Sequence, residues 1–485
     1  MAVTWVKPTG KHIVGRAGEG YLEVCASPLG ELPVVHVSGD REEMGIQYGA
    51  LVANRIRRNV DRSLALFAGL GLPEELVFRL LDNAWKRLEP HVPERYLREM
   101  AAISRGARAA GFPVAVEDLQ RVTTVTNLDM YKREERLAEF LGEDALPYLE
   151  QMKGQRAMSC TMLAVWGSRT VDGKMFAHRN LDWISQTGMH EDRLITVYRP
   201  EDGCAFATMG YAGITGALAG MNENGISFSE VGAFSVREEL DGTPWTLMAR
   251  QVLEDAGCLE DAVAIVENAK HTIGYNYLVA DGAPAHFGAP SFRPRAAAFE
   301  TNFACCETFY ENDDKEHAAA WIASNGRSVP YGLPLCEAVV RADTAFGKRS
   351  RALQATDNGP GEPANDGSPF KEFLGNTYLE CHRPMHDMIR AYETGGEYVY
   401  PLRGRKVIEA CAPRKIGREE ALTIAATVAH NTEKLSMSDW NVMSVVYAPT
   451  DLEFWVSYES RDAEGTWKNA PDSGYWHFSL KDLMA

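Results

Sequence analysis

Apolar residues recur at steps of three and four positions near the start of the chain, after an extended apolar piece at 32–37. The residues on this spacing are Met44, Tyr48, Leu51, Val52 and Ile56. Such spacing places them on one face of an amphipathic helix. Asp40 stands just before the pattern and Glu43 three positions later, the arrangement of a capping box. We therefore predict a helix that begins beside Asp40.

Helical periodicity continues along the next hundred residues. Patterns at 73–88 and 93–110 each open with a proline, which suits the first turn of a helix. A further helical pattern runs from about 115 to 150. We therefore expect residues 1–158 to be largely helical.

At about Met158 the apolar period changes from 3.6 to nearly 2, and short segments are separated by Asp-Gly and Asn-x-x-Gly turns. Strands are predicted at 160–166, 175–181, 194–198, 205–209, 226–231, 277–279 and 297–302, and a closing hairpin at 442–447 and 452–458. Helices are predicted at 245–254, 259–268 and 418–430, and a surface loop at 357–369. Strands, then helices, then strands again favour an α+β layered sandwich over a doubly wound parallel sheet.

Composition narrows the class of protein. The chain has 485 residues, 45% of them hydrophobic and 24% charged, which is typical of a globular protein. Its 50 basic and 67 acidic residues give a net charge of −17. Nucleic acids and anionic membranes require clustered Lys and Arg, so neither is expected as a partner.

Targeting and cysteine patterns point to the cytoplasm. No secretion signal and no apolar stretch of transmembrane length are visible. Nine cysteines are scattered without a CxxC pair, which argues against a disulfide framework or a zinc ribbon. We expect reduced thiols and a cytoplasmic protein.

Common catalytic motifs are absent from the sequence. It contains no GxxxxGK[ST], GxGxxG, HExxH or GxSxG pattern. His382 and His386 are four positions apart but lack an acidic partner motif, so we interpret them as surface or packing residues. No metal and no cofactor is expected. The glycine-rich segment 210–216 is expected to let backbone pass close to a substrate or another strand.

One segment has the residues that a thiol nucleophile needs. Cys160 heads a predicted strand, and Arg179 and Asp182 follow one hairpin later. Cleavage of the bond between Ser159 and Cys160 would free an α-amine whose pKa of about 7.7–8.0 suits a general base. Arg179 could lower the thiol pKa, and Asp182 could orient the amine. Residues three apart on a regular strand point to opposite faces, so this interpretation requires a bend or an end near Asn180.

The same segment resembles a known family. The run at 160–183 reads CTMLAVWGSRTVDGKMFAHRNLDW, preceded at 38–49 by SGDREEMGIQYG and followed at 220–226 by GMNENGI and at 301–303 by TNF. In order and spacing these motifs resemble the cysteine N-terminal-nucleophile (Ntn) hydrolases. That group includes penicillin acyltransferase (acyl-coenzyme A:6-aminopenicillanic acid acyltransferase), acid-ceramidase-like amidases and the choloylglycine (bile salt) hydrolases.

The resemblance implies a four-layer αββα sandwich and self-cleavage before Cys160. The products would be a largely helical α chain, 1–159, and a catalytic β chain, 160–485, which stay associated. It also implies Cys160 as nucleophile, Arg179 and Asp182 as supporting residues and Asn302 as oxyanion donor. Asn222, in contrast, is expected to shape a tight turn.

Two substrate-binding positions follow from the same resemblance. Bile salt hydrolases carry an active-site asparagine where this chain has Gly232, and Glu230 or Ser229 is expected to take its place. A second arginine is expected downstream of the TN motif, and both Arg349 and Arg351 fit, with Arg351 taken as the substrate-binding candidate.

Three functions remain open at this point. The first is an amidohydrolase that cleaves a carboxamide through a Cys160 thioester. The second is an acyltransferase that passes the same acyl group to an amine. The third is a non-enzymatic scaffold, favoured if Arg179, Asp182 and Asn302 fail to converge on Cys160. The expected substrate is a small amide or acyl compound of unspecified identity, and a homo-oligomer is left open.

Overall fold

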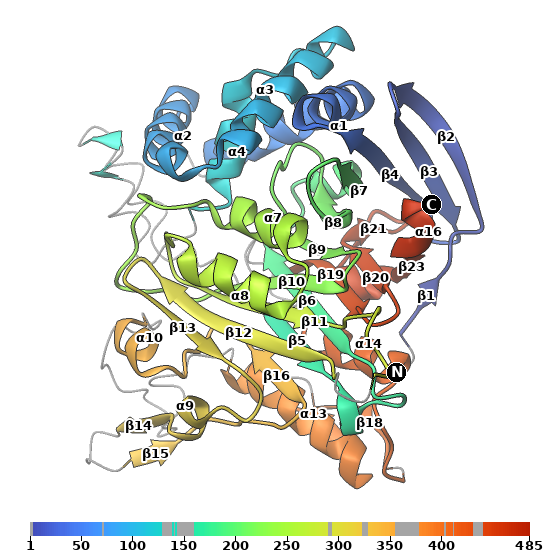
Figure 1. The fold of residues 1–485 in the computed structure, drawn as a ribbon, viewed down its shortest axis with the longest axis vertical. Coiled ribbons are helices and arrows are strands. Elements are labelled where there is room, and N and C mark those ends of the chain that lie inside the picture. Colours follow the sequence, from blue (N-terminus) through green and yellow to red (C-terminus); the bar gives the residue numbers. More distant parts are fainter. Residues whose placement is uncertain are drawn as a thin grey trace.

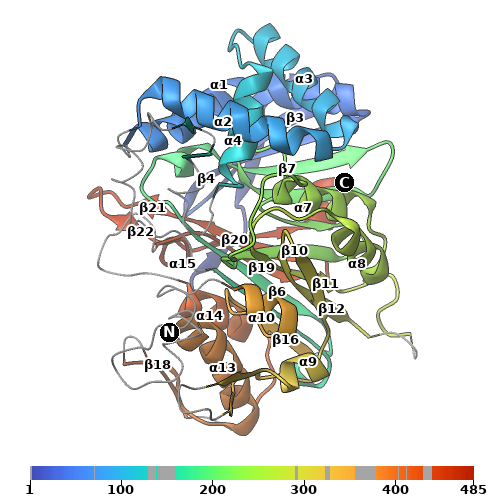
Figure 2. The ribbon, with the colours of Figure 1, turned by 90° about the vertical axis from the view of Figure 1, so that its left-hand side faces the viewer.

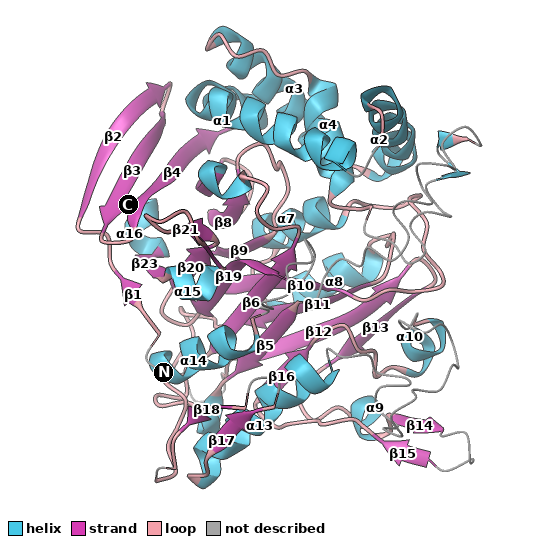
Figure 3. Cartoon of the chain, turned by 180° about the vertical axis from the view of Figure 1, so that it is seen from behind, coloured by secondary structure: helices cyan, strands magenta, loops and turns pink. Residues whose placement is uncertain are grey.

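A computed structural model describes residues 3–69, 72–128, 138–139, 141–142, 160–289, 293–322, 328–354, 378–401, 404–410, 412–429 and 440–485. They form a mixed α/β structure with two large sheets (Figures 1 and 3). Ser159, the predicted loop at 357–369 and most of the predicted helix beyond Val125 lie outside the described residues.

The larger sheet has ten described strands. In spatial order they are β13 (Cys305–Phe309), β12 (Arg295–Asn302), β11 (Tyr275–Asp281), β10 (Ile226–Gly232), β9 (Ala219–Asn222), β8 (Phe206–Tyr211), β7 (Arg193–Pro200), β4 (Gly30–Gly39), β3 (Gly20–Ser27) and β2 (Gly10–Ala17). Neighbouring strands are antiparallel except β4 and β7, which are parallel.

The second sheet has seven described strands. Their order is β1 (Trp5–Val6), β23 (Tyr475–Ser479), β20 (Glu453–Tyr458), β19 (Trp440–Ala448), β6 (Phe176–Trp183), β5 (Thr161–Val165) and β16 (Ala338–Arg341). The predicted closing hairpin is confirmed, since β19 and β20 pair antiparallel. Three two-stranded ribbons complete the strands: β14 (Ala320–Ile322) with β15 (Ser328–Pro330), β17 (Tyr398–Tyr400) with β18 (Arg405–Ile408), and β21 (Ser460–Arg461) with β22 (Trp467–Lys468).

The helices gather at opposite ends and sides of the sheets. Four of them, α1 (Arg41–Gly69), α2 (Glu74–Leu88), α3 (Glu94–Ala109) and α4 (Val116–Val125), lie together at one end of the molecule, and α13 (Arg383–Thr394) lies at the other (Figures 1 and 2). The remaining α-helices among the described residues are α7 (Trp245–Asp255), α8 (Leu259–Asn268), α9 (Asp314–His317), α10 (Lys348–Leu353), α14 (Arg418–Val428), α15 (Ala470–Ser473) and α16 (Leu480–Met484). None of the described helices is both long and apolar enough to span a bilayer.

The predicted start of α1 is confirmed by its hydrogen bonds. The Asp40 carboxylate accepts from the backbone N–H groups of Glu42 and Glu43, both at 2.8 Å. The Glu43 carboxylate accepts in return from the Asp40 N–H at 3.0 Å. These reciprocal bonds satisfy donors that a helix N-terminus otherwise leaves free.

The expectation of a largely helical segment from residue 1 to 158 is wrong for its first part. Residues between Trp5 and Gly39 form β1 to β4, and the helices begin only at Arg41. β1 pairs with β23 at the other end of the chain, and β4 pairs with β7. The segment before Cys160 therefore contributes strands to both large sheets.

The strand that follows Cys160 is buried on both faces. Met162 and Ala164 of β5 belong to the apolar cluster shared with the larger sheet, whereas Leu163 and Val165 belong to the cluster shared with α13 and α14. Alternate side chains of a strand point to opposite faces. Because β5 and β6 also contact β10, the Met162 face of β5 is turned toward the larger sheet.

Candidate active site

Cys160 and Arg179 point to the same face of the seven-stranded sheet. Met162 lies directly opposite Arg179 in the β5–β6 ladder, and Cys160 is two positions before Met162. Cross-strand partners share a face, and so do alternate residues of one strand. This face is turned toward the larger sheet, and both side chains are 0% exposed.

The strand ladder is irregular beside Asp182, although β6 itself continues to Trp183. The pairing between β6 and β19 shifts by one residue between Leu181 and Asp182, where β19 inserts Val442. A bulge of this kind changes the direction of a strand and re-aims side chains. The Cys160 thiol donates to the Asp182 main-chain carbonyl at 3.9 Å, and the Asn441 amide donates to the Asp182 carboxylate at 2.7 Å.

Glu230 of β10, in the opposite sheet, forms an ion pair with Arg179. Its carboxylate accepts from the Arg179 guanidinium at 2.8 Å, with side-chain exposures of 1% and 0%. Arg179 also donates to the main-chain carbonyl of Asn180. Glu230 was expected to contact substrate, but in the continuous chain its carboxylate is engaged with Arg179.

The thiol is strongly perturbed by these surroundings. Burial raises the pKa of the Cys160 thiol to about 12. Arg179 acts against burial and lowers that pKa, while the carboxylates of Glu230 and Asp182 raise it further. Although burial alone would lower the pKa of Arg179, the nearby Cys160 and Glu230 raise it on balance. In the continuous chain Cys160 is therefore a protonated thiol at neutral pH.

A second network of hydrogen bonds lies on the other face of the same strands. Thr161 accepts from the Asn180 amide at 2.8 Å and lies 3.2 Å from the His178 ring nitrogen. Ser444 of β19 donates to the Asn180 carbonyl oxygen at 2.6 Å. These buried bonds hold β5, β6 and β19 in register immediately behind Cys160. Sequence periodicity gives no signal for them, because the partners are up to 264 positions apart.

Asn302 lies at the end of β12 and caps the turn that follows. Its carbonyl oxygen accepts from the Ala304 N–H at 2.9 Å, and its amide donates to the Cys305 sulfur at 3.3 Å. It also lines a cavity of about 10 Å³, which has room for about one water molecule, together with Ser235 and Asn276. Within the described residues no hydrogen bond joins Asn302 to Cys160, so its role as oxyanion donor stays a prediction.

The two candidate arginines of α10 face different neighbours. Arg349 donates to the main-chain carbonyl of Ala304, beside the Asn302 turn, at 3.0 Å. Arg351 lies next to Tyr331, whose pKa burial raises and Arg351 lowers. The assignment of Arg351 to substrate binding stays a prediction.

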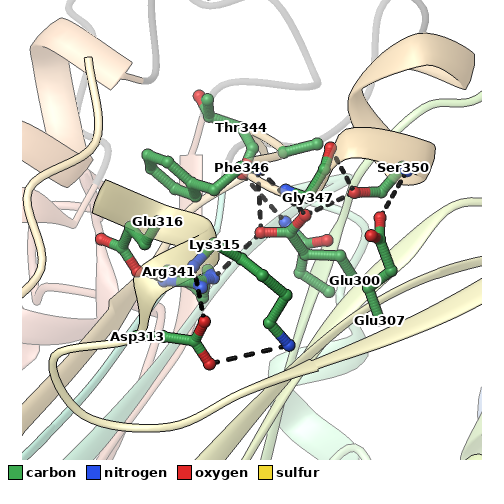
Figure 4. Close-up of polar contacts among 12 residues, drawn as sticks. Glu300, Glu307, Asp313, Lys315, Glu316, Arg341, Thr344, Phe346, Gly347 and Ser350 are labelled. Carbon is green, nitrogen blue, oxygen red and sulfur yellow. Dashed lines mark hydrogen bonds and ion pairs between the residues drawn. The ribbon is translucent and has the colours of Figure 1, made fainter. Parts of the chain in front are cut away.

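A buried carboxylate anchors α10 to β12 (Figure 4). Glu300 accepts from the backbone N–H groups of Phe346 and Gly347 at 2.9 and 2.8 Å and from the Ser350 hydroxyl. Arg341 pairs with the same carboxylate at 3.3 Å. Because Glu300 is two residues before Asn302, this anchor links the position of α10 to the end of β12.

Asn222 and His382, which the sequence analysis also considered, have structural roles. Asn222 accepts from the N–H groups of Asn224 and Ile226 and donates to the carbonyls of Leu253 and Ala256, which confirms the expected tight turn. His382 is buried, and its ring is stacked on Tyr378 with the centroids 5.5 Å apart. In the part of the chain that the structure describes, no cluster of three or more His, Cys, Asp and Glu side chains could hold a metal ion.

Comparison with curated proteins finds two partial relatives. An uncharacterized protein of Archaeoglobus fulgidus is 26% identical over 276 residues, which is 56% of this chain and 45% of the relative. Protein dcd1B of Dictyostelium discoideum is 20% identical over 282 residues, which is 53% of this chain and 50% of the relative. The chain thus spans about half the length of these relatives.

Three solved structures align with the chain at low identity. A Caenorhabditis elegans ortholog of N-acylethanolamine-hydrolyzing acid amidase is 12% identical, with 60% of this chain and 93% of that chain covered and a TM-score of 0.37. A variant of the conjugated bile acid hydrolase of Clostridium perfringens is 13% identical, with 67% of this chain and 93% of that chain covered and a TM-score of 0.35. Penicillin V acylase of Agrobacterium tumefaciens is 11% identical, with 62% of this chain and 83% of that chain covered and a TM-score of 0.30.

One family matches in sequence. The model of the family described as acyl-coenzyme A:6-aminopenicillanic acid acyl-transferase matches residues 168–298. Arg179, Asp182 and Glu230 fall inside this segment, and Cys160 lies just before it. Over residues 168–298 the chain is thus similar to the acyl-coenzyme A:6-aminopenicillanic acid acyltransferase family, and the resemblance predicted from its motifs is confirmed.

Proposed function

We propose that the chain is a cysteine Ntn hydrolase that cleaves a carboxamide bond through a Cys160 thioester. The observation that carries this proposal is the buried thiol at the head of β5, which lies beside the Arg179 guanidinium and donates to the Asp182 main chain. A thiol nucleophile needs a nearby cation and a base, and the match to an acyltransferase family supports acyl chemistry at this site.

Maturation begins at the bond between Ser159 and Cys160. The Cys160 sulfur attacks the Ser159 carbonyl carbon, a C–S bond replaces the C–N bond, and the thiol proton passes to the departing nitrogen. Water then hydrolyses the thioester, which leaves a carboxylate on Ser159 and a free α-amine on Cys160. This amine is the general base that the intact chain lacks.

The mature site repeats the same chemistry on a substrate. The amine takes the thiol proton, the thiolate attacks the amide carbonyl, and the ammonium returns the proton to the leaving amine. Water attacks the acyl-enzyme with the amine again as base, and the acid leaves. Asn302 is proposed as a donor to the oxyanion and Arg351 as a contact for the substrate.

Acyl transfer through the same thioester is the second candidate. The description of the matching family favours it. The two functions differ only in whether water or an amine accepts the acyl group. Partition of one acyl donor between water and added amines separates them: amine-dependent product at constant donor consumption indicates transfer.

We also propose a four-layer αββα arrangement for the catalytic part. The contacts of β5 and β6 with β10 support two facing sheets, α14 contacts the outer face of β6 and β19, and α7 and α8 contact β9 to β12. The α and β chains are proposed to remain together after cleavage, because β1 belongs to the seven-stranded sheet and β2 to β4 belong to the ten-stranded sheet. Homo-oligomerisation stays open.

Intact-mass spectrometry tests the proposal. The purified protein should give two fragments that divide between Ser159 and Cys160, and Cys160→Ala should give one intact chain with no hydrolase activity. Cys204→Ala changes a half-buried cysteine whose thiol donates to the Ala256 main chain; it serves as the control and should cleave normally. A catalytically active chain that is still continuous at Ser159 would refute the mechanism.

A further inference from the structure

A buried ion pair joins β12 to the sheet that carries Cys160. Arg341 of β16 lies directly opposite Met162 of β5, so its side chain shares a face with Cys160. It pairs with Glu300 of β12 at 3.3 Å, and both side chains are 0% exposed. Asn302 is two positions beyond Glu300 on the same strand, and alternate residues of a strand share a face. Asn302 therefore lies on the face of the larger sheet that is turned toward the Cys160 face.

Two carboxylates fix the first turn of α10 to the hairpin of β12 and β13 (Figure 4). Glu300 and Glu307 are cross-strand partners in this hairpin. Besides the bonds of Glu300 described above, the Glu307 carboxylate accepts from the backbone N–H groups of Arg349 and Ser350, at 3.0 and 2.7 Å. These bonds satisfy donors that a helix N-terminus leaves free. The start of α10 therefore cannot shift along the hairpin without losing several hydrogen bonds.

Arg349 connects this fixed helix to the turn that follows Asn302. Its guanidinium donates to the Ala304 main-chain carbonyl at 3.0 Å. The Ala304 N–H donates to the Asn302 side-chain carbonyl at 2.9 Å, and the Asn302 amide donates to the Cys305 sulfur at 3.3 Å. An asparagine amide carries two hydrogens, so one remains for a further acceptor. The contacts of the turn thus set the direction of that hydrogen.

We propose that Arg349 is a positioning residue, which holds the turn after β12 so that the remaining amide hydrogen of Asn302 faces the oxyanion formed during acyl transfer. This inference rests on the proposed function, in which Asn302 is the oxyanion donor. Such a donor acts only within hydrogen-bond distance of the place where the charge develops, so a small displacement of the amide slows the reaction. Glu300 acts in the same way at one step further, because it anchors the helix on which Arg349 stands.

The test compares two neighbouring exposed cations of α10 in the mature enzyme. Arg349→Ala should lower kcat about tenfold and change KM little, because loss of a whole oxyanion donor costs about 10²–10³-fold and the oxyanion exists only after attack. Arg349→Lys keeps a donor and should recover part of the loss. Lys348→Ala is the matched control: Lys348 is equally exposed, and among the described residues it makes no hydrogen bond or ion pair, so kcat should not change.

A double-variant cycle separates positioning from general destabilisation. If Arg349 acts through Asn302, Asn302→Ala/Arg349→Ala should have the same kcat as Asn302→Ala alone, whereas independent effects would multiply. Glu300→Gln is a second variant, and it should lower kcat in the same direction. Its control is Glu316→Gln, since Glu316 pairs with the same Arg341 at 2.9 Å but, within the described part of the chain, makes no hydrogen bond to α10.

The outcomes separate this inference from the proposed function. In an enzyme that is cut before Cys160 and loses kcat in Asn302→Ala, only the inference fails if Arg349→Ala matches its Lys348→Ala control. It fails in the same way if the effects of the two alanine variants multiply. If Asn302→Ala leaves kcat unchanged, the oxyanion role and the inference both fail, and hydrolysis through Cys160 stands. If the chain is not cut, or Cys160→Ala retains activity, the proposed function itself is wrong.

Discussion

A buried ion pair joins the N-terminal helices to the helix α7 that covers the larger sheet. Arg250 of α7 makes two parallel bonds to the Glu99 carboxylate of α3, at 2.9 and 2.7 Å, and donates to the Thr215 main chain at 2.7 Å. The side chains of the pair are 1% and 2% exposed. The perturbation that tests its role is Arg250→Met.

The expected cost of this change follows from burial. Removing one partner leaves the Glu99 carboxylate in a place from which water is excluded, a loss of about 3–5 kcal/mol. Removing both charges with Arg250→Met/Glu99→Gln should cost less than the single change, because no charge is then left without a partner. An exposed pair gives the contrast: Arg295 and Glu260 are 2.6 Å apart but 45% and 62% exposed, so Arg295→Met should cost at most about 1 kcal/mol.

Urea denaturation followed by circular dichroism measures these differences. The background is Cys160→Ala, which is expected to remain a single chain, so that unfolding does not include the separation of two fragments. Burial raises the pKa of Glu99 even though Arg250 lowers it, so the defect of Arg250→Met should shrink as the pH falls and Glu99 takes up a proton. The reasoning is refuted if Arg250→Met costs no more than Arg295→Met, or if the double variant is as unstable as the single one.

Three further changes test other parts of the fold. Burial raises the pKa of Glu459 from 4.5 to about 7, so protonated Glu459 stabilises the folded state below pH 4.5 and this contribution is lost as the pH rises through 7. The gain in unfolding free energy caused by Glu459→Gln should therefore be larger at pH 8 than at pH 4.5, by up to roughly 3 kcal/mol. Equal gains at both pH values would contradict this. Gly216→Ala should lower the thermal midpoint, because its Cβ would lie 2.6 Å from backbone atoms of α7, whereas Gly10→Ala meets no atom within 4 Å and should not. Asn222→Ala should cost about 2–4 kcal/mol in denaturant, since four backbone groups lose their partner, and a cost below 1 kcal/mol would show that water replaces it.

The elements that could be predicted are those whose signal is local. The predicted helix at 259–268 has the same bounds as α8, and the strands around Cys160 and Arg179 were found within two residues, because alternation and turn residues lie within the element itself. The strands β2 and β3 were missed. β2 is mostly exposed and glycines interrupt its pattern, so no apolar face marks it.

The residues of the candidate site also differ in whether the sequence could predict them. Cys160, Arg179 and Asp182 could be proposed together because they lie within one hairpin. Asn441, which holds the Asp182 carboxylate, and the pairing of Glu230 with Arg179 could not be inferred, since they depend on the β6–β19 register and on the distance between two sheets. Sequence spacing gives the residues of one strand pair but not those that a third strand brings to them.

The position of the predicted cut explains how cleavage could change the chemistry of one residue without releasing the rest. Paired strands cross the boundary in both large sheets, β1 with β23 and β4 with β7. Ion pairs cross it as well: the buried Arg250 holds Glu99, and the buried carboxylate of Asp192 is held by the partly exposed Arg58 and Arg62 of α1. Because these contacts join the segments before and after the cut, breaking the bond before Cys160 would leave the packing around β5 intact. The one local change would then be a free α-amine beside a buried sulfur, which is the general base that the proposed mechanism requires.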